Sequence, residues 1–431
     1  MNEKPSGTSW IDTIPATWNI ERMKNQFVFS KGLNITKADL VDDGVAVISY
    51  GQIHAKNNTG TTLSPELLRY ISPENIAITD KSLLHKGDIV FADTSEDYDG
   101  LGNAAYMDGD NETYAGYHTI IARPKNIDYS KYFAYLFKSD AWRVQLRVRA
   151  SGIKVFSVTQ RMLNDVTLIM PEKNAIKPIF SFLDDRCYKI DSIIAEAKAS
   201  IEEYKELKQA VIYEAVTKGL DKNAPMKDSG VEWIGESPLD WNIIRVKHLL
   251  TEINNRSEQG IEEPLSVSQV LGIVPSSEIS VANPTSSYIG QKVVEQHDMV
   301  FNRLKAHLGV FFESNYKGLV SPDYAVFRGN KRINPKFLEY LFHTPAAITE
   351  FKKYITGVGD GLRRLYTDDL FNISVSIPSI EIQNEIISKL NLKVQKMDAM
   401  ISEKQSLIQD LESYKKSLIY EVVTGKRKVV E

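Results

Sequence analysis

The sequence predicts an α+β fold of two similar halves, each a globular mixed α/β domain followed by one long helix. The two helices are expected to pair antiparallel as a coiled coil that separates the domains. Residues 171–217 match residues 378–424 without a gap, at a constant offset of 207. A tryptophan motif recurs at a constant offset of 223. Two duplications in the same order predict an internal repeat with a pseudo-twofold arrangement.

Each of the two matched stretches predicts one long helix. Their apolar residues recur at spacings of four and three, which is the pattern of a helix that packs on another helix. A helix of about 40 residues is about 60 Å long at roughly 1.5 Å per residue, and with one apolar stripe it needs a partner. The repeat copy is the partner we expect; the alternative is two unrelated amphipathic helices on separate cores. The expected seam comprises Leu183, Cys187, Ile190, Ile194, Ile201, Leu390, Val394, Met397, Ile401 and Ile408, with Lys404 as a polar interruption.

The tryptophan motif stands at the entrance of each half. Trp10 and Trp18 in the first copy correspond to Trp233 and Trp241 in the second, so four of the five tryptophans belong to it. Two aromatic side chains at the start of a domain favour a packing role, in which they anchor the chain on a core, over a ligand role.

The order of motifs divides the chain into four segments. We expect a first globular domain at 1–170, a long helix at 171–220, a second globular domain at 221–377 with a linker at 219–228, and a second long helix with a basic tail at 378–431. Strands are predicted at 45–50, 88–92, 118–122, 165–169, 298–301, 324–327 and 373–377, and short helices around 135–137 and 340–342. Between these landmarks the two bodies differ, a pattern that favours two readers with different targets.

Composition places the chain among ordinary globular proteins. Its formal net charge of −4 argues against a uniformly basic coat but leaves room for local basic surfaces. The single cysteine, Cys187, falls on the predicted helix seam, and no apolar signal region or membrane-length apolar run is present. These features predict a cytoplasmic protein.

Motifs for catalysis are absent from the sequence. It contains no Walker-type phosphate loop and no His-Glu-x-x-His, and the seven histidines form no metal-ligand spacing with Cys187. The nearest match to the Asn-Pro-Pro-aromatic motif of amino-methylating DNA methyltransferases is Asn283-Pro284-Thr285, which lacks the second proline and the aromatic residue. Residues 357–361 resemble a nucleotide loop but follow a helical segment, so a turn is favoured. No catalytic residue or metal ligand is therefore expected.

Two local basic clusters occupy matching places in the two bodies. Each follows a short helix and surrounds a glycine-containing turn, and such clusters can follow a phosphate backbone. Solvated charged faces are the alternative. The alternating residues at 143–149 suggest a strand, but the second copy is helical, so we predict a helix for both. The clusters comprise Arg143, Arg147, Arg149, Lys154 and Arg161 in the first body and Lys352, Lys353, Arg363 and Arg364 in the second.

A weaker signal comes from polar residues that follow apolar stretches. Glutamine amides can read adenine edges, and hydroxyl groups adapt to several bases. Ordinary polar loops explain the pattern equally well. The candidate DNA contacts of this kind are Tyr50, Gln52, Ser268, Gln269, Arg303 and Lys305.

The layout of these motifs resembles the specificity subunits of type I restriction–modification systems. The resemblance rests on the duplicated Ser-Gly-x-x-Trp-Ile…Pro…Trp entrance, on the helix start from Pro378 to Ile386 with Gln383, and on the Tyr-Glu-x-Val-Thr helix end. It covers essentially the whole chain. The first helix start departs from the pattern because Ile176 stands where the second copy has Gln383.

The resemblance implies a non-catalytic subunit in which 1–170 and 221–377 are DNA target-recognition domains and the long helices at 171–220 and 378–431 are spacers. Each recognition domain would read one half of an asymmetric bipartite site on double-stranded DNA. The long helices would set the spacing and dock two methyltransferase subunits, and motor-endonuclease subunits would join them. S-adenosylmethionine, ATP and Mg would then be cofactors of those partners, with none in this chain. The alternatives are a recognition subunit of a methylation-only or other nuclease system, and a protein-interaction scaffold that does not bind DNA.

Overall fold

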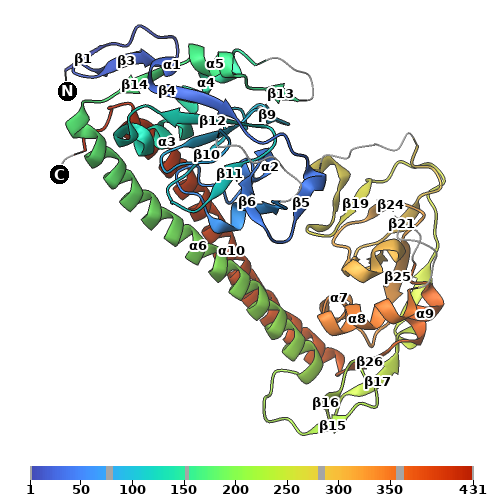
Figure 1. Cartoon of the computed structure of the whole chain (residues 1–431). Coiled ribbons are helices and arrows are strands. Elements are labelled where there is room, and N and C mark those ends of the chain that lie inside the picture. Colours follow the sequence, from blue (N-terminus) through green and yellow to red (C-terminus); the bar gives the residue numbers. More distant parts are fainter. Residues whose placement is uncertain (1, 74–80, 151–154, 280–286, 356–363, 430–431) are drawn as a thin grey trace. The chain divides into compact units, whose positions relative to one another are not determined.

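The computed structural model describes residues 2–73, 81–150, 155–279, 287–355 and 364–429 (Figure 1). The chain forms two compact units. Unit 1 contains residues 1–197 and 406–431, and unit 2 contains residues 198–405, so each unit includes part of each long helix. Among the described residues, no helix is both long and apolar enough to cross a membrane.

Both predicted long helices are present. They are α6 (Lys173–Lys218) and α10 (Ile380–Val423). The predicted seam residues of α6 are buried, and those of α10 are buried or half-buried. In unit 1, Lys415 Nζ lies 2.6 Å from both carboxylate oxygens of Asp191. In unit 2, Lys208 Nζ lies 2.6 Å from Asp398 Oδ1. These contacts confirm antiparallel pairing, and at the repeat offset the two ion pairs are copies of each other.

The polar interruption of the seam has its own partner. Lys404 is half-buried in unit 2, and its Nζ lies 5.9 Å from the ring centroid of Tyr204 on α6. A cation over an aromatic face can remain on a helix seam without a carboxylate partner.

The central sheet has the same topology in both units. Its four strands are antiparallel throughout, and buried apolar side chains cover both of its faces. In unit 1 the order is β10-β8-β12-β4, and in unit 2 it is β23-β22-β25-β18. The bounds are β4 (Phe27–Lys31), β8 (Ile89–Ala92), β10 (Ala104–Tyr106), β12 (Thr119–Pro124), β18 (Leu250–Ile253), β22 (Met299–Phe301), β23 (Phe311–Glu313) and β25 (Ala325–Gly329).

Smaller pairs of strands are also repeated. Each half begins with a two-stranded antiparallel sheet, β1–β2 or β15–β16. A second antiparallel pair, β3–β14 or β17–β26, connects the segment after the first pair with the residues just before the long helix. The bounds are β1 (Glu3–Pro5), β2 (Thr13–Pro15), β3 (Asn19–Arg22) and β14 (Thr167–Met170) in unit 1, and β15 (Met226–Asp228), β16 (Glu236–Pro238), β17 (Asn242–Arg245) and β26 (Ser374–Ile377) in unit 2.

Three short helices follow the central sheet in each unit. The helix prediction is confirmed for the first part of each basic cluster, since α4 carries Arg143 and Arg147 and α8 carries Lys352 and Lys353. The bounds are α3 (Ser130–Lys138), α4 (Asp140–Arg147), α5 (Gln160–Asp165), α7 (Pro335–Phe342), α8 (Pro345–Tyr354) and α9 (Thr367–Asn372). One-turn helices are α1 (Met23–Gln26), α2 (Tyr50–Ile53), η1 (Lys37–Asp39), η2 (Pro65–Leu67), η3 (Ile127–Tyr129), η4 (Val246–His248) and η5 (Ser276–Glu278), and η6 (Arg303–Leu308) is a longer segment kinked at Lys305.

The two units differ in their remaining strands. Unit 1 adds a mixed four-stranded sheet, whereas unit 2 adds an antiparallel hairpin and a separate antiparallel pair. The predicted contrast between a shared framework and different connections is therefore present. The bounds are β5 (Leu40–Val41), β6 (Val45–Ile48), β7 (Arg69–Ile71), β9 (Thr94–Ser95), β11 (Thr113–Ala115) and β13 (Phe156–Ser157) in unit 1, and β19 (Leu265–Ser268), β20 (Gly272–Pro275), β21 (Lys292–Val294) and β24 (Gly318–Val320) in unit 2.

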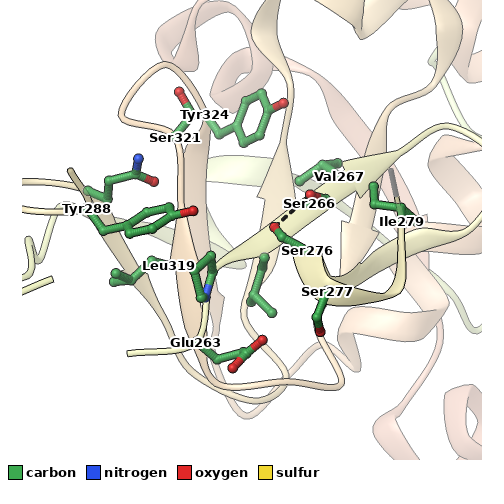
Figure 2. A pocket seen from close by; sticks show the side chains of 13 residues that line it. Glu263, Ser266, Val267, Ser276, Ser277, Ile279, Tyr288, Leu319, Ser321 and Tyr324 are labelled. Carbon is green, nitrogen blue, oxygen red and sulfur yellow. Dashed lines mark hydrogen bonds between the residues drawn. The ribbon is translucent and has the colours of Figure 1, made fainter. Parts of the chain in front are cut away.

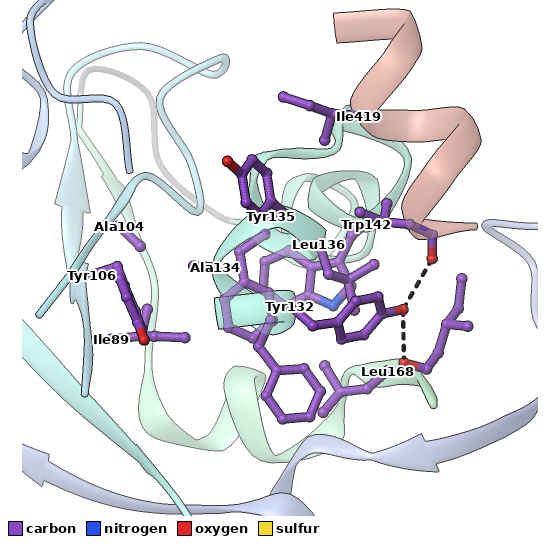
Figure 3. Close-up of a cluster of buried hydrophobic side chains, with 14 of the residues drawn as sticks. Ile89, Ala104, Tyr106, Tyr132, Ala134, Tyr135, Leu136, Trp142, Leu168 and Ile419 are labelled. Atoms are coloured by element: carbon purple, nitrogen blue, oxygen red, sulfur yellow. Dashed lines mark hydrogen bonds between the residues drawn. The ribbon is translucent and has the colours of Figure 1, made fainter. Parts of the chain in front are cut away.

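The core of each unit joins the short helices to one end of a long helix. In unit 1, α3 packs on Leu418 and Ile419 of α10 (Figure 3). Tyr132 Oη lies 2.9 Å from the carbonyl oxygen of Val423 and 3.1 Å from that of Ile169. This fully buried hydroxyl therefore ties the end of α10 to strand β14.

The tryptophan motif has the packing role that its sequence favours. Trp18 and Trp241 are buried in their units. Each lies against the left-handed glycine that follows a long helix, Gly425 in unit 1 and Gly219 in unit 2. Glycine adopts this conformation without steric cost and so ends a helix. Each indole thus anchors a domain entrance to a helix end.

Candidate nucleic-acid interface

Arg143, predicted to contact DNA, is directed into the core instead. Its side chain is buried, and its Nε donates to the carbonyl oxygen of Phe137 at 2.8 Å. Burial lowers the pKa of its guanidinium to about 10. The prediction was wrong because charge pattern cannot show which face of α4 (Asp140–Arg147) is covered.

The rest of the first basic cluster divides into paired and exposed residues. Arg147 Nη2 donates to Asp140 Oδ1 and to the carbonyl oxygen of Asp99, both at 3.0 Å, so much of its charge is neutralised. Arg149 and Arg161 are exposed, and Lys154 lies outside the described residues. Arg149 and Arg161 remain the candidates for phosphate contact in unit 1.

The basic cluster of the second unit is divided in the same way. Lys353 Nζ lies 2.9 Å from carboxylate oxygens of both Glu232 and Glu350, and these partners raise the pKa of Lys353. Lys352 is exposed and Arg364 is half-buried, while Arg363 lies outside the described residues. Lys352 and Arg364 therefore remain candidates.

Tyr50 lies in a group of aromatic side chains that only the fold assembles. Its ring centroid is 5.5 Å from that of His118, 5.6 Å from that of Tyr117 and 6.3 Å from that of His54, all in edge-to-face orientation. Gln52 Oε1 accepts a bond from the backbone N–H of Ser49, which uses one of its polar atoms locally. The group offers hydroxyl and imidazole atoms that can donate or accept.

An acidic residue completes this polar group in unit 1. His118 has a left-handed backbone, with φ of 53°, and its Nδ1 lies 3.1 Å from Asp93 Oδ1. A pocket of about 490 Å³ opens beside Tyr50 and His54, lined also by Glu96 and other residues of the loop after β9. Carboxylates accept a bond from the cytosine amino group, so this polar group can serve direct base readout.

In unit 2 the fold unites two predicted candidates, Arg303 and Arg364. The backbone N–H of Leu365 donates to the carbonyl oxygen of Arg303 at 3.2 Å, which brings the residue after Arg364 against η6. Lys305 is exposed on the same short helical segment, η6. The sequence alone gave no reason to place these cations together.

Arg303 also belongs to a charge cluster that sequence reasoning missed. Its Nη2 lies 2.6 Å from Glu252 Oε1, and Lys292 Nζ lies 3.7 Å from the same oxygen. Arg256 pairs with Lys292 through an isolated antiparallel bridge. These four residues come from separate strands and loops, so no local motif announces them.

Hairpin β19–β20 presents the remaining candidates. Ser268 Oγ accepts bonds from the backbone N–H groups of Val270 and Leu271, so it shapes the turn. Gln269 is exposed, and Val270 and Leu271 are 89% and 59% exposed. The turn therefore presents one amide and two apolar side chains to solvent, and apolar groups of this kind can contact the thymine methyl.

A pocket of about 740 Å³ with both polar and apolar lining residues adjoins this hairpin (Figure 2). Tyr288 and Tyr324 stand on its wall, and Ser266 and Ser276 face each other with their hydroxyl oxygens 2.8 Å apart. Burial raises the pKa of Tyr324, which keeps its hydroxyl protonated. The lining suits hydrogen bonds to a planar polar group.

One ion pair is common to the two units and marks the shared framework. The guanidinium of Arg123 donates hydrogen bonds to both carboxylate oxygens of the buried Asp88 in unit 1, and that of Arg328 does the same to the buried Asp298 in unit 2. Each aspartate precedes the second strand of the central sheet, and each arginine lies on the neighbouring strand. An ion pair kept in both copies is best explained by folding.

Beside this common pair the two units have opposite charge. Asp93 in unit 1 and Arg303 in unit 2 occupy equivalent positions. Each lies two residues after a phenylalanine, in β8 or in β22. The carbonyl oxygen of Asp93 accepts from the backbone N–H of Val158, and that of Arg303 accepts from the backbone N–H of Leu365. Likewise Phe29 in unit 1 corresponds to Glu252 in unit 2. Each pairs across the sheet with the residue just before the arginine of the common ion pair, Arg123 or Arg328. The same framework therefore presents an aspartate–histidine pair in one unit and a cationic cluster in the other.

Comparison with known proteins identifies the fold. No family model and no curated protein matches the sequence. A chain from a structure of the complex assembly and conformational transition of the type I R-M system is 16% identical; the match covers 96% of this chain and 99% of that one, with a TM-score of 0.70. The HsdS subunit from Thermoanaerobacter tengcongensis is also 16% identical; the match covers 96% and 98%, with a TM-score of 0.53. The chain therefore has the HsdS fold along nearly its whole length.

Proposed function

We propose that this chain is the DNA-specificity subunit of a type I restriction–modification system, in which each unit reads one half of an asymmetric bipartite site on double-stranded DNA. The observation that carries the proposal is the repeated framework with different chemistry at equivalent positions. Asp93 with His118 suits base edges that donate, whereas the Arg303 cluster suits acceptors and phosphates. One framework with two such surfaces suits two different half-sites.

The proposal includes partners and their cofactors. Two methyltransferase subunits would dock on the long helices, and motor-endonuclease subunits would join that complex. The chain itself is proposed to be non-catalytic and cytoplasmic. S-adenosylmethionine, ATP and Mg would belong to the partner subunits. The HsdS fold supports this division of labour, and so does the absence of catalytic motifs in the sequence.

Selection from random DNA tests the proposal. The full chain, together with the methyltransferase subunit encoded beside it, is incubated with a pool of random duplexes, and the bound DNA is sequenced. We expect one enriched motif with two different half-sites at a constant spacing. A pool without any enriched motif would favour a protein-interaction scaffold.

A further inference from the structure

Lys292 in unit 2 is a buried cation with little neutralisation. The residue is 3% exposed on strand β21 (Lys292–Val294). Its one ion pair among the described residues is with Glu252, at 3.7 Å between Nζ and Oε1, which is beyond hydrogen-bonding distance. A lysine buried to this extent is usually paired closely or discharged.

Glu252 has to serve more than one cation. Arg303 Nη2 lies 2.6 Å from the same carboxylate oxygen and 3.1 Å from the Thr367 hydroxyl. Arg256, the bridge partner of Lys292, donates to the carbonyl oxygen of Gly290. The charged groups that act on Lys292 are thus two arginines and one glutamate. With Lys292 included, three positive charges face one negative charge.

Unsatisfied donors add to this excess charge. Arg303 Nε is buried and has no hydrogen-bond partner among the described residues. Burial and the two arginines lower the pKa of Lys292, so the folded chain holds the ammonium at a cost. A buried donor without a partner is also costly. An oxyanion among these groups would relieve both costs.

The repeat acts as an internal control for a purely structural role. Unit 1 builds the same central sheet with Phe29 in place of Glu252 and Asp93 in place of Arg303. The framework therefore forms without this cluster. By contrast, the Asp88–Arg123 pair recurs as Asp298–Arg328. The cluster of Lys292, Arg303, Arg256 and Glu252 is a special feature of unit 2.

We propose that Lys292, Arg303 and Arg256 form a binding site for a phosphate group, occupied by a backbone phosphate of the half-site that unit 2 reads. The assignment to DNA rests on the proposed function. Guanidinium groups bind two phosphate oxygens at once, and the lysine supplies a point charge beneath them. Arg256 is exposed and Arg303 is half-buried, so the site opens to solvent beside the buried lysine.

A first experiment tests the site without DNA. Thermal unfolding of the full chain is measured in sodium phosphate and in sodium chloride at equal ionic strength, for wild type, Lys292→Met and Arg256→Gln. We expect phosphate to raise the melting temperature of wild type. Lys292→Met should lose that response and melt no lower than wild type in chloride. Arg256→Gln, an exposed change that leaves the core intact, should weaken the response.

Two results of the melting experiment would overturn the site. One is an equal phosphate response in wild type and both variants. The other is an absent response in wild type together with a lower melting temperature of Lys292→Met in chloride, which would make Lys292 a structural residue. Both readouts are independent of DNA, so they decide the site even if the chain proves not to bind duplexes.

A second experiment distinguishes a backbone phosphate from free phosphate. Binding of the full chain, with its methyltransferase partner, to a random-sequence duplex is measured at several salt concentrations. Loss of one phosphate contact should reduce the slope of log K against log salt by about one in Lys292→Met. Lys331→Met is the matched control, because Lys331 is exposed and follows β25 at the opposite end of the sheet from Glu252. An unchanged slope in Lys292→Met, with the phosphate response intact in wild type, would refute the DNA assignment.

Discussion

Arginines that stand close together in the sequence have separate roles in this fold. Arg143 supports the core of unit 1, Arg147 is neutralised by Asp140, and Arg149 is exposed. All three lie within seven residues, so a count of charges treats them alike. Arg143 and Arg147 are four residues apart and so lie on nearly the same face of α4, and Arg149 lies beyond its end. Their difference therefore arises from the groups that the fold brings to each position.

Arg149 and Arg161 yield the first residue-scale prediction. The double change to Ala should weaken binding of random duplexes and reduce the salt slope by up to about two, because both side chains are exposed. Stability should change by no more than about 0.5 kcal/mol. Anisotropy titrations across salt concentrations provide the measurement. The control is the double change Lys37→Ala with Lys125→Ala, which removes two exposed lysines elsewhere in unit 1 and should retain more of the salt slope. Equal losses of slope in the two double variants would show that Arg149 and Arg161 do not contact DNA.

Lys138 yields a prediction about pH. Burial and the nearby cations Arg143 and Lys415 lower its pKa to about 8, from an ordinary value of 10.5. Below pH 8 the charged ammonium of Lys138 lowers the free energy of unfolding. Between pH 8 and 10.5 the unfolded chain binds more protons at Lys138 than the folded chain does, so the contribution of Lys138 to stability rises with pH. Lys138→Met should therefore stabilise the chain at pH 7, by roughly 1–3 kcal/mol.

Denaturant unfolding at pH 7 and at pH 9.5 measures this effect. The advantage of Lys138→Met over wild type should shrink at the higher pH, where wild-type Lys138 is already neutral when folded. A variant that is less stable than wild type at pH 7 would mean that the ammonium has a stabilising partner.

At the scale of elements, the start of α10 depends on one amide. Gln383 is fully buried: its Nε2 donates to the carbonyl oxygens of Arg332 and Pro378, and its Oε1 accepts from the backbone N–H of Asn334. It thus joins the helix start to the loop before α7. The matching residue of α6, Ile176, is buried by packing instead. Different chemistry therefore anchors two helices of the same pattern.

Gln383→Ala should destabilise unit 2 by about 2–4 kcal/mol, because three backbone groups lose their partner inside the protein. The neighbouring Asn384→Ala is the control; Asn384 is exposed and accepts one bond from Asn334 Nδ2, so its loss should cost less than about 1 kcal/mol. Thermal unfolding compares the two. Equal effects would show that Gln383 contributes no more than a surface residue.

At the scale of the whole molecule, the internal repeat suggests modular recognition. Each unit has its own core and its own candidate DNA surface. Replacing residues 25–170 with the corresponding body of another specificity subunit should therefore alter one half-site of the selected motif and preserve the other. Sequencing of the bound pool reports the result. A change in both half-sites would contradict modular reading.

Helix length gives a second prediction at this scale. One heptad inserted at equivalent points of α6 and α10 preserves the seam pattern and lengthens each helix by about 10 Å. If the helices set the distance between the two readers, the half-site spacing should grow by roughly three base pairs, at about 3.4 Å each. The same selection measures the spacing, and an unchanged value would rule out the helix pair as the determinant.

The framework of this protein can be predicted from its amino-acid sequence alone. Constant offsets predicted the duplication, and a 4-3 spacing predicted the helix seam; buried seam residues such as Leu183 and Leu390 confirm it. The spacing of apolar residues along a helix or strand shows which of its faces is buried, and this spacing is visible in the sequence alone.

Which polar residues share a surface, by contrast, depends on the three-dimensional fold. Lys292 and Glu252 are 40 residues apart in sequence, and Lys292 and Arg303 both approach the same carboxylate oxygen of Glu252. The same folding buried Arg143 and paired Lys353 with Glu232. Charge clusters depend on strand pairing and on contacts between segments distant in the sequence. Neither produces a periodic pattern in the amino-acid sequence.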